Sequence, residues 1–174
     1  MRRGAWSVLA RKWATWRGLG ARQRHEVLHA WLRLGVVDLL LLVMPFRRLA
    51  PQLGESVSPS VDSPPLALGD VLRARRIAAN VRRAARYSPW PAKCLAQALV
   101  TRRFLHANGI ACVVRLGLSK EPSAPSGSAG MKAHAWVECA DAVIIGGRGS
   151  RDTFTRVASF LTPGRRGHDV ESQR

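Results

Sequence analysis

The spacing of apolar residues predicts two helical regions in the first half of the chain. One, at about residues 22–49, is expected to form one or two helices, because apolar side chains recur with the period of a helix at Leu28, Trp31, Leu32, Val36 and Leu39. The other spans about residues 68–86 and carries a face of arginines. Between them, residues 55–66 are rich in serine and proline, a composition typical of a linker.

A third helix is predicted to begin at Cys94. Two prolines, Pro89 and Pro91, favour extended backbone just before it, and neither glycine nor proline follows until Gly109, a common helix end. Unpaired N–H groups and the positive end of the helix dipole both stabilise a thiolate at a helix start. The plainer interpretation is a small apolar residue that fills the junction between a loop and a helix.

Alternating apolar positions predict antiparallel strands after this helix. Residues 110–118 alternate, and residues 131–147 have the pattern of two strands joined by a turn at Ala140-Asp141. On the first strand of this hairpin, one face is expected to carry His134, Trp136 and Glu138, and the other Ala133, Ala135, Val137 and Cys139. Residues 119–130 are predicted to form a flexible loop.

Charge and composition narrow the classes of function. The 174 residues include 28 Lys and Arg against 11 Asp and Glu, a net charge of +17, which indicates an anionic partner. Lysines are few and alanine is abundant, so part of this excess reflects compositional bias. Because no zinc-finger, homeodomain or RNA-binding signature accompanies the charge, nucleic acid is not an expected partner. Three cysteines without CxxC spacing argue against a disulfide scaffold and fit the reducing cytoplasm.

The most apolar stretch, residues 35–46, is shorter than the roughly 20 residues of a membrane span and contains Asp38. A buried or interfacial helix is therefore expected there. With its basic flanks, contact with a membrane surface stays open as an alternative, which would place the protein at the inner face of the membrane.

The order of these elements indicates nucleophilic chemistry. A thiol at a helix start and a histidine on the adjoining antiparallel sheet form the layout of a cysteine nucleophile and its base. Cys94 is therefore the candidate nucleophile and His134 the candidate general base and acid, while an ordinary core histidine is the plainer interpretation of His134. The expected fold class is α+β, with the nucleophile helix packed on a small antiparallel sheet behind N-terminal helices.

Two motifs carry a resemblance to a known family. The segments "CLAQALVTRRFLHANGIACVVRLGLSK" and "AHAWVECADAVIIGG" resemble the transglutaminase-like, papain-type "B" peptidase of lasso-peptide biosynthesis, related to the C-terminal part of the microcin-processing enzyme. The resemblance covers about residues 36–160. It implies a bacterial cysteine peptidase, without metal or cofactor, that removes the leader from a ribosomally made precursor peptide. A partner lasso cyclase, a macrolactam synthetase, then closes the freed amine onto a side-chain carboxyl. Carried over by residue, Cys94 is the nucleophile and His134 the base and acid.

The third catalytic position departs from that family, which carries an acid where this chain has Gly146-Gly147. If the turn takes two residues, Gly147 lies opposite His134. Asp152 is the other acid nearby, and a backbone carbonyl or a water could serve instead. The third position is left open.

The predicted organisation is a basic helical region at 1–54, a linker at 55–66, a peptidase core at 67–163 and a disordered basic tail at 164–174. About 35 residues precede the family-like part, too few for the winged-helix-like domain that binds leaders in this family. A separate leader-recognition protein is therefore expected. Two rival classes stay open: a Cys–His acyltransferase or transglutaminase, and a catalytically degenerate basic adaptor, for which Gly146-Gly147 is the best argument.

Overall fold

The computed structural model describes residue 18 and residues 20–120 and 131–164. The first 17 residues of the predicted basic region and the predicted tail from residue 165 onward lie outside the described residues. So does most of the predicted loop at 119–130, although Ser119 and Lys120 belong to a strand.

Helices and strands both build the described part of the chain, which confirms the predicted α+β class. The helical elements are α2 (Ala21–Val43), α3 (Phe46–Leu49), the 3-10 helix η1 (Ala50–Leu53), α4 (Leu68–Arg86), α5 (Cys94–Ala107) and α6 (Ser150–Thr153). The strands are β1 (Glu55–Val57), β2 (Cys112–Lys120), β3 (Met131–Cys139), β4 (Ala142–Ile145) and β5 (Thr155–Thr162). They form one sheet in the order β1-β5-β2-β3-β4, with every neighbouring pair antiparallel.

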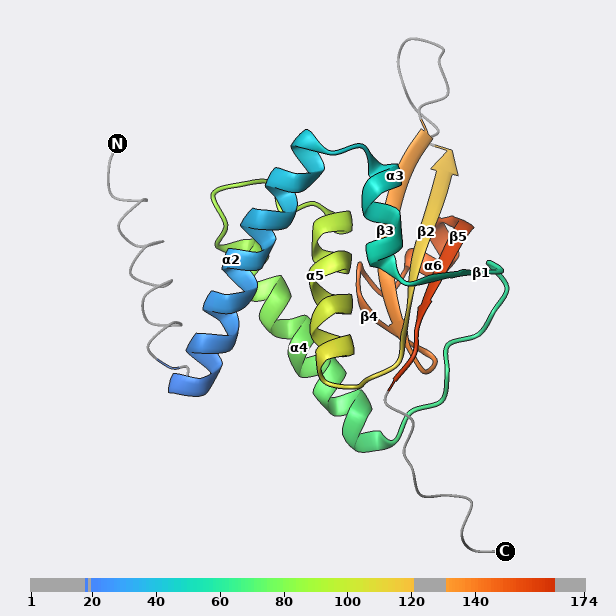
Figure 1. Ribbon diagram of the computed structural model, residues 1–174. Helices are drawn as coiled ribbons and strands as arrows, with labels where there is room; N and C mark the ends of the chain where they lie inside the picture. Colours follow the sequence, from blue (N-terminus) through green and yellow to red (C-terminus); the bar gives the residue numbers. More distant parts are fainter. Residues whose placement is uncertain (1–17, 19, 121–130, 165–174) are drawn as a thin grey trace, which may run out of the picture.

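The three long helices form a layer on one side of the sheet (Figure 1). Helix α5 contacts α2 and α4 on one side and strands β2 and β3 on the other, so it is the central element of the molecule. Its buried face meets apolar residues of both layers in one core cluster, which includes Leu34, Val81, Val114 and Val137. The cysteine-bearing helix is therefore held by contacts on several sides.

Helix α2 has apolar residues on two faces, and only one of them is buried. Val27, Ala30 and Leu34 are 3% exposed or less and pack in the core, whereas several of the residues that predicted the helix face outward. These exposed residues are Leu28, Leu32, Val36 and Leu39. Of the described helices, none combines the length and apolar character needed to cross a membrane.

The segment predicted as a linker is tied to the sheet at its start. Residues 55–57 form β1, which pairs with β5 along Glu55↔Leu161 to Val57↔Ser159. The residues that follow β1 are held by Arg115. Its guanidinium donates hydrogen bonds to the carbonyl of Pro59, at 3.2 Å, and to the carbonyl of Val61. Three residues are too few to show strand alternation, so composition alone could not reveal this pairing. The sequence likewise did not predict β5.

Candidate active site

Cys94 is the first residue of α5, as predicted, and the turn before it is fixed by neighbouring elements. The Ala92 N–H donates to Oδ2 of Asp38 on α2 at 2.9 Å, and the Gln97 side chain donates to the Ala92 carbonyl at 2.7 Å. Ala92 itself has a positive φ of 41°. These two bonds hold a strained turn in place, and so they set where the thiol of Cys94 lies.

Asp38 thus has a positioning role that the sequence did not reveal. It interrupts the most apolar stretch of the chain, and burial raises the pKa of its carboxyl, although the Ala92 hydrogen bond and the charge of Lys93 oppose this shift. A lone acid within an apolar helix was the available signal, because such a group is costly to bury unless it is hydrogen-bonded.

Aromatic packing supports the same turn. The Trp90 ring, four residues before Cys94, lies 4.5 Å from the Trp31 ring of α2, measured between centroids. Gly35 makes room for it, since a Cβ there would stand 2.9 Å from Cζ2 of Trp90. The segment between α4 and α5 therefore docks on α2 by both polar and apolar contacts.

The three cysteines differ in environment. Cys94 is half-buried, whereas Cys112 and Cys139 are both fully buried in the core. Burial raises the pKa of the Cys112 thiol to about 12, and burial also raises the pKa of Cys139 well above its usual range. Both core cysteines are therefore neutral thiols near pH 7, and neither is a candidate nucleophile.

We expect iodoacetamide at pH 6 to label the folded protein at Cys94 and to leave Cys112 and Cys139 unmodified. The buried pair are closed to the reagent and hold their protons, so they react only after unfolding in urea. Peptide mapping by mass spectrometry gives the site of each adduct. Labelling of a core cysteine as fast as Cys94 would contradict the assignment.

The imidazole of His134, on β3, is held by a backbone carbonyl. Its Nε2 lies 2.7 Å from the carbonyl oxygen of Gly146, and its ring stacks on Phe154 with centroids 4.7 Å apart. A carbonyl can only accept a hydrogen bond, so Nε2 carries a proton in this contact, and in the neutral ring Nδ1 carries the lone pair. Within the described residues Nδ1 has no hydrogen-bond partner. His134 is therefore in the tautomer that can take a proton through Nδ1.

Gly146 is shaped for this contact. Its φ is +103°, and a Cβ there would stand 2.3 Å from the Cβ of Trp136, so no side chain fits. The Ser150 hydroxyl donates to the same carbonyl at 2.9 Å. The carbonyl that holds His134 is thus itself fixed from the start of α6.

The hairpin register explains why the carbonyl reaches His134. The predicted turn at Ala140-Asp141 is confirmed, and Cys139 pairs with Ala142 beside it. An irregularity then shifts the pairing by one residue, because Glu138 pairs with Val143 but Val137 pairs with Ile145. The uniform register that would set Gly147 opposite His134 is therefore not the one observed, and Gly146 meets Trp136 instead.

Asp152, the acid considered for the third position, lies on α6 and is exposed. Within the described residues it makes no hydrogen bond with His134. The structure brings the Gly146 carbonyl to that position on the imidazole.

Glu138, on the same strand as His134, is the centre of a buried network of charged and polar side chains. Glu138 is 1% exposed; it accepts from Nε1 of Trp136 at 2.8 Å, Nε of Arg151 at 2.8 Å and Nε of Arg115 at 3.1 Å. Burial by itself would raise the pKa of Glu138, but the hydrogen bonds of Arg151 and Trp136 and the charge of Arg115 hold it below its usual range. Trp136 is fully buried and packs beside His134, with ring centroids 6.1 Å apart. The hydrogen bonds of Glu138 therefore hold Trp136 in place, and the Trp136 ring in turn packs against His134.

Helix α5 and strand β3 lie side by side and run in the same direction, so Cys94 and His134 belong to the same end of the pair (Figure 1). In the described residues no hydrogen bond joins the Cys94 thiol to His134. Catalytic hydrogen bonds are often longer in the absence of substrate than in its complex, so the two residues stay candidates on their placement at this common end.

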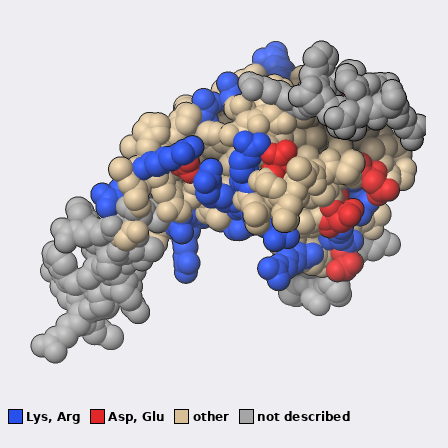
Figure 2. All heavy atoms as spheres, turned by 90° about the horizontal axis from the view of Figure 1, so that it is seen from below, with Lys and Arg blue, Asp and Glu red and all other residues tan. Residues whose placement is uncertain are grey.

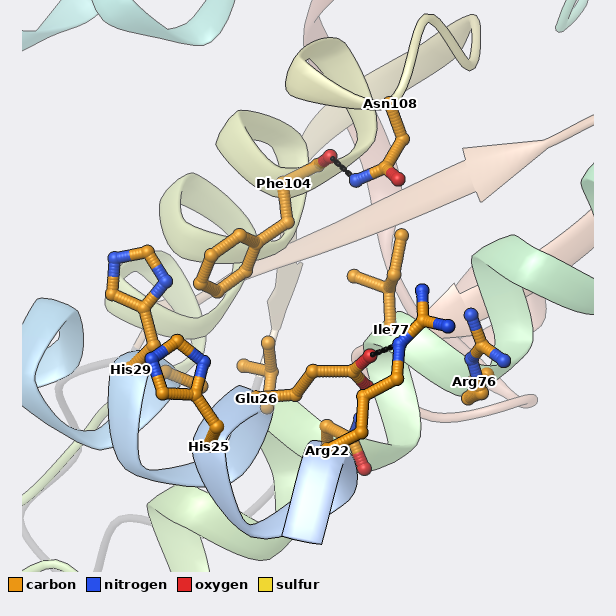
Figure 3. Close-up of a pocket in the computed structure, with 11 residues that line it drawn as sticks. Arg22, His25, Glu26, His29, Arg76, Ile77, Phe104 and Asn108 are labelled. Atoms are coloured by element: carbon orange, nitrogen blue, oxygen red, sulfur yellow. Dashed lines mark hydrogen bonds and ion pairs between the residues drawn. The ribbon is translucent and has the colours of Figure 1, made fainter.

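A histidine-bearing pocket lies elsewhere, between α2, α4 and α5 (Figure 3). Its acid, Glu26, accepts from Asn80 at 2.8 Å and pairs with Arg22 at 3.4 Å. Burial and the charge of Arg33 lower the pKa of His29, which accepts a hydrogen bond from Arg33. The hydrogen bond from Asn80 to Glu26 joins α4 to α2, so the polar groups of this pocket have a structural role. Among all described residues, no three His, Cys, Asp or Glu side chains are placed to hold a metal ion.

Comparison with protein families gives one match, in which the model described as the transglutaminase-like superfamily covers residues 40–159. The chain belongs to the transglutaminase-like superfamily. Comparison with curated proteins and with solved structures gives no match. The superfamily region runs from the last turn of α2 into β5, so it includes both Cys94 and His134.

Proposed function

We propose that this transglutaminase-like protein is a cysteine peptidase that removes the leader peptide from a ribosomally made lasso-peptide precursor. The observation that carries the proposal is the bond between Nε2 of His134 and the Gly146 carbonyl. It leaves Nδ1 free to accept a proton, in a superfamily region whose half-buried cysteine opens a helix. The precursor substrate comes from the resemblance of the two motifs around Cys94 and His134.

The proposed reaction begins when His134 takes the proton of the Cys94 thiol at Nδ1. The thiolate attacks the carbonyl carbon of the last leader residue, and the backbone N–H of Cys94, in the first turn of α5, stabilises the oxyanion. The imidazolium then gives its proton to the departing amine of the core peptide. Water, deprotonated by His134, hydrolyses the thioester and restores the thiol.

A neutral carbonyl suffices as the partner of His134 in this scheme. The thiolate and the imidazolium attract each other, so their ion pair itself holds the ring near the sulfur. The carbonyl needs only to select the tautomer with the proton on Nε2. The degenerate-adaptor alternative, which rested on the missing acid, loses its main argument if the carbonyl fills this role.

We expect the chain alone to cleave its precursor slowly and a separate leader-binding protein to raise the rate at least about tenfold. Binding energy from the remote leader would hold the scissile bond at Cys94, which raises the effective concentration of substrate. Mass spectrometry of the precursor with and without the leader-binding protein measures the two products. A lasso cyclase then consumes the freed core.

An added primary amine provides the control for acyl transfer. Hydrolysis gives a leader with a free carboxyl end, whereas transfer to the amine gives a leader amide of different mass. A product that is mainly amide at low amine concentration would replace the peptidase proposal with an acyltransferase. Equal cleavage with and without the leader-binding protein would show that leader binding lies within this chain.

A further inference from the structure

We infer that an arginine-lined hollow beside β4 binds acidic side chains of an extended peptide, and that this peptide is the substrate of the proposed peptidase. The hollow has a volume of about 650 Å³. Arg75 and Arg82 reach it from α4, and Arg148 and Arg151 reach it from the segment after β4. Among the described residues that line it, the only acid is Asp141 in the hairpin turn.

Two of the four arginines are available to a ligand. Arg82 donates to the Ile144 carbonyl at 2.5 Å, and Arg151 is bound to Glu138. Arg75 and Arg148 are exposed, and among the described residues neither has an ion-pair or hydrogen-bond partner. Figure 2 shows Lys and Arg side chains spread over the face seen from below, with Asp and Glu side chains between some of them. A guanidinium fork matches a carboxylate, so unpaired arginines in a hollow favour an acidic ligand.

The wall of the hollow favours a peptide over a small anion. Strand β4 is the last strand of the sheet, and among the described residues its outer edge pairs with no other strand, although the Ile144 carbonyl already accepts from Arg82. Ala142, Val143 and Ile144 of this strand line the hollow. An extended peptide can hydrogen-bond to such an edge while its side chains reach pockets on either side. A free phosphate would use the arginines and leave the strand edge unused.

The position of the hollow links it to the catalytic residues. Gly147 lines it, and the carbonyl of the adjacent Gly146 holds His134. A peptide that lies along β4 therefore leads toward His134. That the bound peptide is a substrate rests on the proposed function, whereas the binding of acidic peptide does not.

Fluorescence anisotropy with the full chain carrying Cys94→Ala tests binding without cleavage. The probes are a labelled peptide in which glutamate alternates with threonine and a matched peptide with glutamine in place of glutamate. We expect the acidic probe to bind about tenfold more tightly. Arg75→Gln combined with Arg148→Gln should weaken its binding about tenfold. The control, Arg86→Gln with Arg103→Gln, removes the same charge from exposed arginines outside the hollow and should change binding less than twofold.

Equal losses in the two double variants would overturn the inference, because general charge would then explain the binding. Competition by single-stranded DNA as effective as that of the acidic peptide would also overturn it, since a polyanion site would then replace a peptide site. Turnover is measured separately with Cys94 intact. If the acidic probe binds selectively but the chain with Cys94 intact does not cleave the precursor, the proposed function is wrong and the inference about the hollow stands. If that chain cleaves the precursor but the acidic probe binds no better than its glutamine counterpart, the inference about the hollow is wrong and the proposed function stands.

Discussion

Cys94→Ala is expected to abolish leader cleavage, lowering turnover at least about a thousandfold, because no other described cysteine can supply the nucleophile. Cys112→Ala and Cys139→Ala should keep most of the activity, since both thiols are buried and protonated. Single-turnover cleavage of a matched precursor, with the leader-binding protein present, measures all three variants. Comparable losses in the three would contradict the nucleophile assignment.

His134→Ala should lose turnover to a similar extent, because thiol activation and protonation of the leaving amine both depend on the imidazole. Asp152→Ala is its matched control. Asp152 is exposed and does not contact His134, whose Nε2 is held by the Gly146 carbonyl, so turnover should not change. A large loss in Asp152→Ala would mean that an acid, and not the carbonyl, orients the histidine during catalysis.

Glu138→Gln is expected to lower the free energy of unfolding by about 3–5 kcal/mol. The substitution leaves the guanidinium of Arg115, which is 1% exposed, without its counter-charge inside the protein. It also weakens the hydrogen bonds that fix Trp136 and Arg151. Urea denaturation at pH 7, with the slope of the transition compared between variants, measures the loss.

Glu55→Gln is the matched control, because Glu55 is exposed on the edge strand β1 and should change stability by less than about 0.5 kcal/mol. The pH dependence gives a second test. The folded pKa of Glu138 is lowered, so its contribution to stability is present above the unfolded pKa of about 4.3 and is lost as the pH falls through the folded value. The wild-type protein should therefore lose part of its advantage over Glu138→Gln in acid. A difference that stays constant from pH 7 to pH 3 would contradict the proposed charge state.

The Gly146 carbonyl also bears on how this site differs from the acid-bearing sites of the family that it resembles. A carboxylate would stabilise the imidazolium by charge, whereas a carbonyl offers a dipole only. The nearby positive charges of Arg148 and Arg151 belong to the hollow and the Glu138 network. The group that orients His134 therefore carries no charge. In the proposed mechanism the Cys94 thiolate is the counter-ion of the imidazolium.

Local signals in the sequence were enough to predict the bounds of several helices and turns. The prolines before Cys94 and the Asn-Gly after Ala107 set the ends of α5, and the predicted helix at 68–86 matches α4. The hairpin turn at Ala140-Asp141 follows from alternation on either side of it. Such features depend on backbone preferences over a few residues, which a single sequence contains.

Other features depended on contacts between distant segments. Helix α2 is apolar on two faces, so its period could not show that Leu34 is buried and Leu39 exposed. Strands β1 and β5 show too little alternation to be recognised, and their pairing with each other and with β2 defines them.

The candidate catalytic residues show the same division between local and tertiary signals. Residue type and local pattern singled out Cys94 and His134, because a helix start and a strand face are local properties. The partner of His134 was decided by a one-residue shift in the β3–β4 pairing, which brings a backbone carbonyl to the imidazole. A carbonyl belongs to every residue and has no signature in sequence, so only the tertiary structure could select Gly146 for this contact.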